Sequence, residues 1–407
     1  MSFIQQHETY QSMSFYESIN SEQNNSMGYQ LPYSTLQVIH LKDSRIYALI
    51  CVYQMIYIPC IVLGYVGFDC MFVNLSVQVI AQFSILSYKV KTLLNDSKNY
   101  HEGMKRLVLR HYRLIRWAEI LEDNFNFPIM QQLLGTTIHI CISGYYVLMG
   151  PETKDILTSI LFVLYMFSVT STLFIYCFIG ECFIQESTNF GNAIYNYEWY
   201  NLPAIDAKFF LICMIRTKKP QFLTSGKFAI LSLTVFTDEQ GIANVRRSFI
   251  WNSRLLKCMG IWPLQNYVPV FLFFFTYLSL HCSLTLAELL WAPKTMDNVV
   301  ANIAENIILT MTLTKITIAR MNREALRELF IELEEYSLTE KYETKEEKLT
   351  FVNYTKLPPY FIIIIACSMT LAESMYYLNR VIEGIQFDIV SHTKTYSYTN
   401  TRACNNR

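Results

Sequence analysis

Long apolar segments with few or no charges are the feature of this 407-residue chain that most restricts its fold. About 20 apolar residues in a helix cross the hydrocarbon core of a bilayer, and backbone groups in lipid must be hydrogen-bonded within their own segment. The sequence therefore predicts an all-α, polytopic helical membrane protein with six full spans. The alternative is a large soluble protein with buried core helices. The six segments lie at residues 46–88, 133–149, 156–180, 264–287, 299–318 and 357–378.

The first of these segments is too long for a single crossing. As one helix, residues 46–88 would measure about 65 Å, which is roughly twice the hydrocarbon thickness. We expect one long or kinked helix that continues beyond the membrane, with two helices around Asp69 as the alternative. Residues 89–128 and 322–348 alternate apolar and charged side chains with helical spacing, so both are expected to be membrane helices continuing into the cytosol.

A seventh apolar stretch, Phe222 to Phe236, is shorter and carries Lys227. Lys218 and Lys219 precede it, and Arg246 and Arg247 follow it, so basic residues flank both of its ends. Since Lys and Arg collect on the cytoplasmic side, this stretch is expected to be a short partial span. It either dips into the membrane and returns or packs against other helices.

The distribution of basic residues predicts the orientation of the spans. Residues 89–128 hold eight Lys and Arg side chains and residues 319–358 hold seven, whereas the turns at 150–155 and 288–298 hold one each. The positive-inside rule then places 89–128, 181–263 and 319–358 in the cytosol. The N-terminus, both short turns and the C-terminal tail are expected outside.

The sequence lacks the motifs of common catalytic and metal sites. It has no phosphate-binding loop, no HExxH and no GxSxG, and its 11 Cys and seven His show no metal-ligand spacing. We therefore expect no enzyme activity, no cofactor and no metal. Lys plus Arg equals Asp plus Glu at 33 each, so no basic excess indicates nucleic acid. Glu305 is interpreted as lying near the outer interface, with a ligand or ion role as the alternative.

Several strings in the first 237 residues, taken in order, resemble insect odorant receptors. Phe68-Asp69 with the segments that follow resembles the fourth helix of that family, and Ser143-Gly144-Tyr145 resembles the fifth. Two further groups are similar to the sixth helix with its exit loop and to the start of the seventh. These groups are Tyr176–Glu181 with Glu186-Ser187 and Ala193–Trp199, then Lys219-Pro220 with Leu223–Phe228 and Leu231–Leu233.

The resemblance breaks after Thr237, where the family's pore-lining second half of the seventh helix would follow. Residues 1–237 thus resemble helices four to seven (first half) of one receptor. Residues 238–407 look like the N-terminus and helices one to three of a second receptor. A fused gene model of two tandem genes explains this most simply, and a permuted receptor is the alternative.

The resemblance implies an odorant receptor subunit that detects volatile small molecules. It would act as a ligand-gated cation channel in a heteromer with the olfactory co-receptor. The resemblance also implies a multi-pass protein of the plasma membrane of an olfactory neuron dendrite, where membrane lipid surrounds it. A small apolar and aromatic pocket in the outer half of the bundle would bind the ligand. The candidate lining residues are Tyr53, Met55, Tyr57, Tyr145, Tyr146, Ile160 and Leu164.

Other functional classes remain as alternatives. A gustatory-type receptor shares the architecture, and a non-functional fused product would have none of these activities. A secondary transporter would need paired broken helices around a midplane site, which the sequence does not suggest. Because the family's pore-lining segment is missing after Thr237, we expect no odorant-gated current from this chain with the co-receptor.

Overall fold

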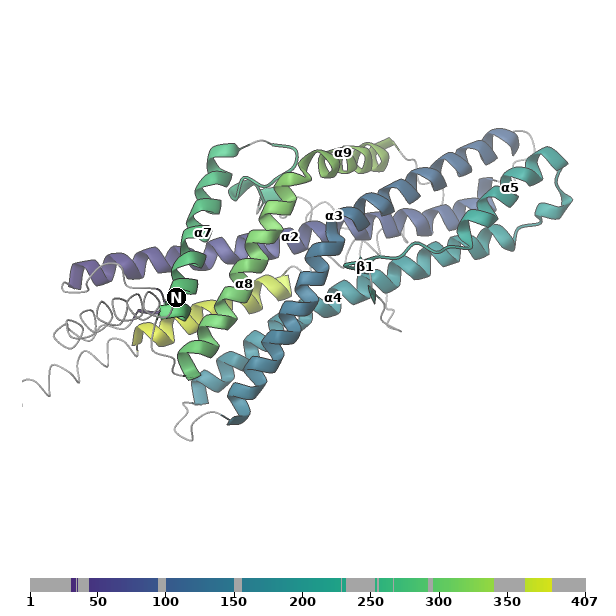
Figure 1. Cartoon of the computed structure of the whole chain (residues 1–407). Helices are drawn as coiled ribbons and strands as arrows, with labels where there is room; N and C mark the ends of the chain where they lie inside the picture. The colour runs from purple at the N-terminus through teal and green to yellow at the C-terminus, as the bar shows by residue number, and fades with distance from the viewer. Residues whose placement is uncertain are drawn as a thin grey trace, which may run out of the picture.

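The computed structural model of this chain is a bundle of long helices with one small hairpin (Figure 1). It describes residues 31–33, 35, 44–93, 100–149, 156–227, 229–231, 253–254, 256–265, 267–291, 296–339 and 363–382. The helices are α2 (Ser44–Leu93), α3 (Tyr100–Met149), α4 (Ile156–Tyr195), η1 (Trp199–Asn201), α5 (Ala204–Thr217), α7 (Val268–Trp291), α8 (Met296–Met321) and α9 (Arg323–Thr339). A further helix covers residues 363–382.

The long apolar segment near the N-terminus forms one helix. α2 runs without interruption for 50 residues and contains Pro59. Asp69, which marked the alternative boundary between two helices, is buried in the middle of it. This outcome confirms the prediction of one long helix, because an apolar stretch of this length satisfies its backbone within a single helix.

The charged segments 89–128 and 322–348 are also helical where the structure describes them. The first forms the beginning of α3, which continues without a break to Met149 as predicted. The second forms α9, which is described to Thr339. α9 differs from a straight continuation, because α8 ends at Met321 and α9 leaves in another direction (Figure 1).

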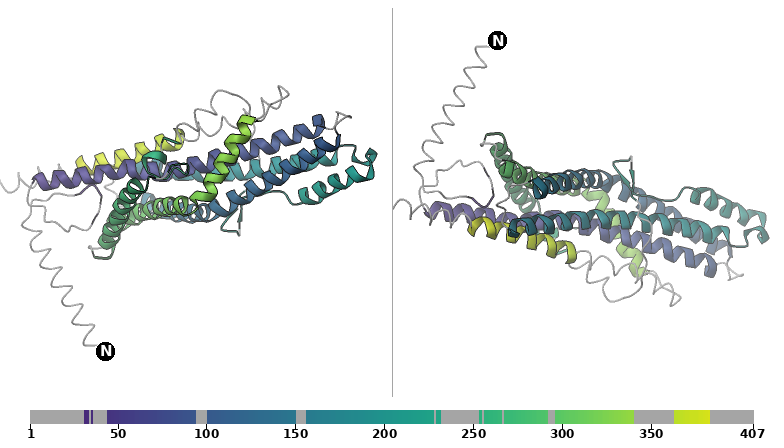
Figure 2. Two further views of the ribbon diagram at one scale, coloured as in Figure 1. Left: turned by 90° about the horizontal axis from the view of Figure 1, so that it is seen from above. Right: turned by 90° about the horizontal axis from the view of Figure 1, so that it is seen from below.

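The helices form two groups that share one interface. α2, α3 and α4 lie lengthwise against one another and reach the same end of the molecule, where α5 packs beside α4 (Figure 1). At the other end α7, α8 and the 363–382 helix lie around α2. Views from above and below show this arrangement from both faces (Figure 2). α8 contacts α2, α3 and α7, so it is the central element of the second group.

The stretch from Phe222 does not form the predicted partial-span helix, and this is a correction. In its described part, Thr224–Ser225 (β1) pairs antiparallel with Ala229–Ile230 (β2). The turn has positive φ at Gly226 and Lys227, a conformation that a right-handed helix does not contain. The hairpin sits close to α4, since a Cβ added at Gly180 would collide with Leu231. Residues 232–236 lie outside the described residues.

Three of the described helices are long and apolar enough to cross a membrane. The qualifying segments are Arg45–Val90, Val163–Asn201 and Val268–Trp291, which belong mainly to α2, α4 and α7. The predicted class, an all-α helical membrane protein, is therefore confirmed. The crossings assigned to 133–149 and 299–318 coincide with helical residues in α3 and α8, and the part of 357–378 that the structure describes, from residue 363, is helical as well.

Candidate ligand-binding site

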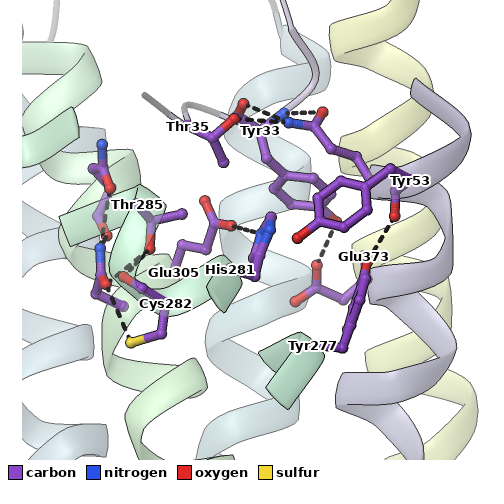
Figure 3. Close-up of polar contacts among 12 residues, drawn as sticks. Tyr33, Thr35, Tyr53, Tyr277, His281, Cys282, Thr285, Glu305 and Glu373 are labelled. Atoms are coloured by element: carbon purple, nitrogen blue, oxygen red, sulfur yellow. Dashed lines mark hydrogen bonds and ion pairs between the residues drawn. The ribbon is translucent and has the colours of Figure 1, made fainter. Parts of the chain in front are cut away.

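Tyrosine rings and carboxylates meet where α2, α7, α8 and the 363–382 helix come together (Figure 3). We refer to this group as the tyrosine cluster. Most of its side chains are buried, and all except Tyr33 come from apolar segments that were predicted to cross lipid. Polar groups in such a place must bind one another or a ligand. The cluster consists of Tyr33, Tyr53, Tyr57, Tyr277, His281, Glu305 and Glu373.

Tyr33 inserts into the bundle from the segment that precedes α2. Its hydroxyl donates a hydrogen bond to Glu373 Oε2 at 3.1 Å. Its backbone N–H donates to Gln54 Oε1 at 3.2 Å, and Gln54 Nε2 donates back to the Tyr33 carbonyl oxygen at 3.1 Å. The Gln54 amide thus replaces the backbone partners that an extended segment lacks inside a helical bundle.

A histidine and a glutamate link α7 to α8 in the middle of the cluster. His281 Nε2 lies 3.1 Å from Glu305 Oε1, and the His281 side chain is fully buried. The Tyr57 ring lies against the imidazole, with 4.4 Å between centroids, and the Tyr33 ring meets Tyr57 edge-on at 4.9 Å. The Tyr33 and Tyr57 rings therefore lie beside a Glu305 carboxylate that already has His281 as its partner.

Tyr53 contributes one of two unsatisfied polar atoms that the described residues place in the cluster, and the buried His281 Nδ1 is the other. Its carbonyl oxygen accepts a hydrogen bond from the Tyr277 hydroxyl at 2.6 Å, and the two rings lie 5.0 Å apart. The Tyr53 hydroxyl is buried and has no hydrogen-bond partner among the described residues. A buried hydroxyl without a partner costs free energy, so this position favours a ligand that can bind to it.

The residues predicted to line the site fall into distinct environments. Tyr57 is buried at the centre of the cluster, and Tyr53 is partly buried at its edge. Met55 is 53% exposed and faces away from the bundle interior. The structure thus brings Tyr53 and Tyr57 together and leaves Met55 outside the cluster.

The other predicted lining residues belong to α3 and α4. Ile160 is exposed, and Leu164 is partly buried next to Tyr165. The Tyr165 hydroxyl is buried without a partner among the described residues, and its ring lies 4.5 Å from that of His139. Tyr145 and Tyr146 lie on α3, but their side chains are outside the described residues.

Sequence reasoning missed most of the polar side chains of the cluster. His281 had no spacing partner, and its contact with Glu305 depends on how α7 packs on α8. Tyr33 and Glu373 are 340 residues apart. The usable signal was the presence of Glu305 and Glu373 in apolar segments, because such charges are usually functional. No group of three His, Cys, Asp or Glu within the described part of the chain is placed to hold a metal ion.

Comparison with known proteins relates the first part of the chain to one family. The family model described as 7tm Odorant receptor matches residues 3–239. Odorant receptor 13a of Drosophila melanogaster is 26% identical over 212 residues, which is 47% of this chain and 47% of that protein. Odorant receptor 85b of the same species is 23% identical over 177 residues, covering 43% and 45% of the two chains.

A third relative is similar at the same level. Putative odorant receptor 69a, isoform B, of Drosophila melanogaster is 27% identical over 165 residues, covering 39% of this chain and 40% of that protein. The chain spans about half the length of the curated relatives it matches. No solved structure matches the chain.

Proposed function

Because this chain belongs to the 7tm odorant receptor family, we propose that it is an odorant receptor subunit that binds a volatile small molecule in the tyrosine cluster. It associates in a heteromer with the olfactory co-receptor of a ligand-gated cation channel family, but without the family's pore-lining segment after Thr237 it supplies the ligand site and not an odorant-gated pore. It resides in the plasma membrane of the olfactory neuron dendrite. The observation that carries the proposal is the buried, unpaired Tyr53 hydroxyl beside the Tyr57 and Tyr277 rings.

The contacts of the cluster support a ligand with one or two polar groups. Glu305 is bound by His281, and Glu373 is bound by Tyr33, so both carboxylates already have partners. The rings of Tyr53, Tyr57 and Tyr277 offer apolar faces, and the Tyr53 hydroxyl and His281 Nδ1 offer two polar anchors. A small alcohol, ketone or ester of mainly apolar character matches this pattern, because such sites work by shape with few polar contacts.

The family assignment also bears on catalysis. The 7tm odorant receptors are receptors and channels, so the expectation that the chain is not an enzyme is confirmed. The proposed site needs no reacting group. It needs only a difference in packing between the free and the bound bundle, which a ligand at the junction of α2, α7 and α8 supplies.

The first prediction tests the anchor. Tyr53→Phe keeps the ring and removes the hydroxyl, so binding of alcohols, ketones or esters should weaken by about tenfold while that of the matching alkanes is unchanged. The full chain is reconstituted in nanodiscs, and a panel of C6–C8 alcohols, ketones, esters and alkanes is titrated against intrinsic fluorescence.

The matched control is Tyr112→Phe, because Tyr112 is 70% exposed on the first part of α3, away from the cluster. The control should bind the panel like the unchanged chain. The proposal is wrong if no compound binds, or if both variants lose the same affinity.

A further inference from the structure

The family match ends at residue 239, yet the described residues beyond it pack into the matched part. We infer that the described residues between 253 and 382 form the second half of one helical bundle, bound in cis to a surface of α2, α3 and α4. The occupant of that surface is this chain's own C-terminal part and not a second copy. The inference concerns assembly and does not depend on the proposed ligand.

A buried ion pair joins the two halves. Lys315 Nζ of α8 lies 2.6 Å from Asp69 Oδ1 of α2, and the two side chains are only 1% and 2% exposed. Tyr176 of α4 also donates a hydrogen bond to Asp69. Without Lys315, Asp69 would be a buried carboxylate with no cation, which is strongly unfavourable.

The surroundings of Lys315 come entirely from the matched half. Lys315 Nζ donates to Gln132 Oε1 of α3 at 3.1 Å and lies 3.5 Å from the centroid of the Tyr65 ring. The Tyr65 hydroxyl donates to the same Gln132 oxygen at 2.8 Å. α2, α3 and α4 thus present a fitted acceptor site for one cation, and α8 supplies it.

Hydrogen bonds also join the halves at other places along the bundle. Tyr377 of the 363–382 helix donates to the Cys51 carbonyl oxygen at 2.8 Å. Ser368 of the same helix lies 3.1 Å from Ser168 of α4, Oγ to Oγ. These contacts lie away from the ion pair, so the interface extends along the bundle.

Glycines let the halves approach closely. A Cβ added at Gly64 would lie 2.8 Å from Thr312 Cγ2, and one at Gly135 would lie 2.6 Å from Met311 Sδ. Membrane helices use small residues in this way to bring backbones together. Close approach, a buried ion pair and hydrogen bonds at separate depths are what one folded bundle requires. Two unrelated halves that merely share a chain would need none of them.

The first experiment tests the contact by cross-linking. A protease site is inserted after Gly241 in the full chain, and Gly64→Cys is combined with Thr312→Cys, which also removes the crowding methyl. After oxidation and cleavage in detergent, a non-reducing gel should show one band of full-chain mass. Gly144→Cys with Thr312→Cys is the control, because nothing lies within 4 Å of a Cβ at Gly144. This control should give two separate fragments. If the Gly64→Cys, Thr312→Cys protein also gives two separate fragments, the inference is wrong.

A mixing experiment distinguishes cis from trans assembly. One chain carries only Gly64→Cys and a second, differently tagged chain carries only Thr312→Cys. Co-expression should give no cross-linked product. A product here would mean that the halves pair between copies, which overturns the assignment to a single chain.

The ion pair provides an independent readout. In the cleaved protein, Lys315→Met should lower the co-purification of the two fragments by at least about tenfold, because it leaves Asp69 unpaired. Adding Asp69→Leu to Lys315→Met should restore most of it, since no buried charge remains. If the single variant co-purifies like the unchanged protein, the ion pair does not hold the halves together.

Discussion

His111 makes the stability of the first part of α3 depend on pH. It is buried against Phe190, with 4.6 Å between ring centroids. Burial, and to a smaller extent the charge of Arg216, lowers the pKa of His111 to about 4. The imidazole is therefore neutral in the folded protein at pH values where it would be protonated in the unfolded chain.

The second residue-scale prediction follows from the direction of this shift. A lowered folded pKa gives stability that is complete above the unfolded value of about 6.5 and is lost as the pH falls towards 4. Between pH 7.5 and pH 5 the loss should be about 2 kcal/mol. Thermal unfolding in detergent at both pH values, with and without His111→Phe, measures it.

The variant His111→Phe should show a smaller drop in Tm between the two pH values than the unchanged chain. His101→Phe is the control, because His101 sits on the same helix against the ring of Phe209. The control should keep the full drop, and an equal drop in all three proteins would contradict the role of His111.

At the same scale, the sequence predicted part of the candidate site. Tyr53 and Tyr57 were found because they lie in the outer half of a long apolar segment. Met55 lies between them and points away, since residues two apart on a helix do not share a face. His281 and Glu373 were not found, because their contacts depend on helices packing across long sequence separations.

Among the elements, α2 was predictable and the hairpin was not. The apolar segment at residues 46–88, in which Asp69 is the one charge, has few ways to satisfy its backbone other than one helix. The stretch from Phe222 is also apolar, but Glu122 of α3 accepts hydrogen bonds from both the backbone N–H and the hydroxyl of Thr224. This side-chain contact from another helix is invisible in local composition.

The hairpin supplies the element-scale prediction. Glu122→Gln replaces a charged acceptor with a neutral one, so docking of β1 should weaken by about 1 kcal/mol. Hydrogen exchange at the amides of residues 224–231 should become several-fold faster. Asp123→Asn is the control, because the Asp123–Lys227 pair spans 3.4 Å with both side chains more than 60% exposed. If both variants change exchange equally, Glu122 does not hold the hairpin.

For the whole molecule, the class of fold was predictable and the joining of its halves was not. Six apolar segments suffice to predict a helical membrane protein. That Asp69 would meet Lys315, 246 residues later, cannot be read from either segment alone. Both were visible as charges in apolar surroundings, but their partnership is a property of the assembled bundle.

The whole-molecule prediction concerns conduction. A channel needs a continuous pore-lining surface, and the sequence departs from the family pattern after Thr237. Co-expressed with the olfactory co-receptor, the 407-residue chain should give no odorant-gated current in whole-cell recordings, even where the nanodisc assay detects binding. An intact receptor of the family, recorded in the same cells, is the positive control. A robust current from this chain would show that its pore is built from other elements.

The length of α2 also magnifies any bend of the helix at Pro59. Pro59 removes one backbone hydrogen bond between the tyrosine cluster and the rest of the helix, so bending there is easier than elsewhere. From Pro59 to Leu93 the helix measures about 50 Å. A tilt of about 2° at this pivot would swing the far end by about 2 Å. The cluster thus lies on the short side of the pivot, and the long side carries Asp69 and Phe83, which contact Tyr176 and Phe183 of α4.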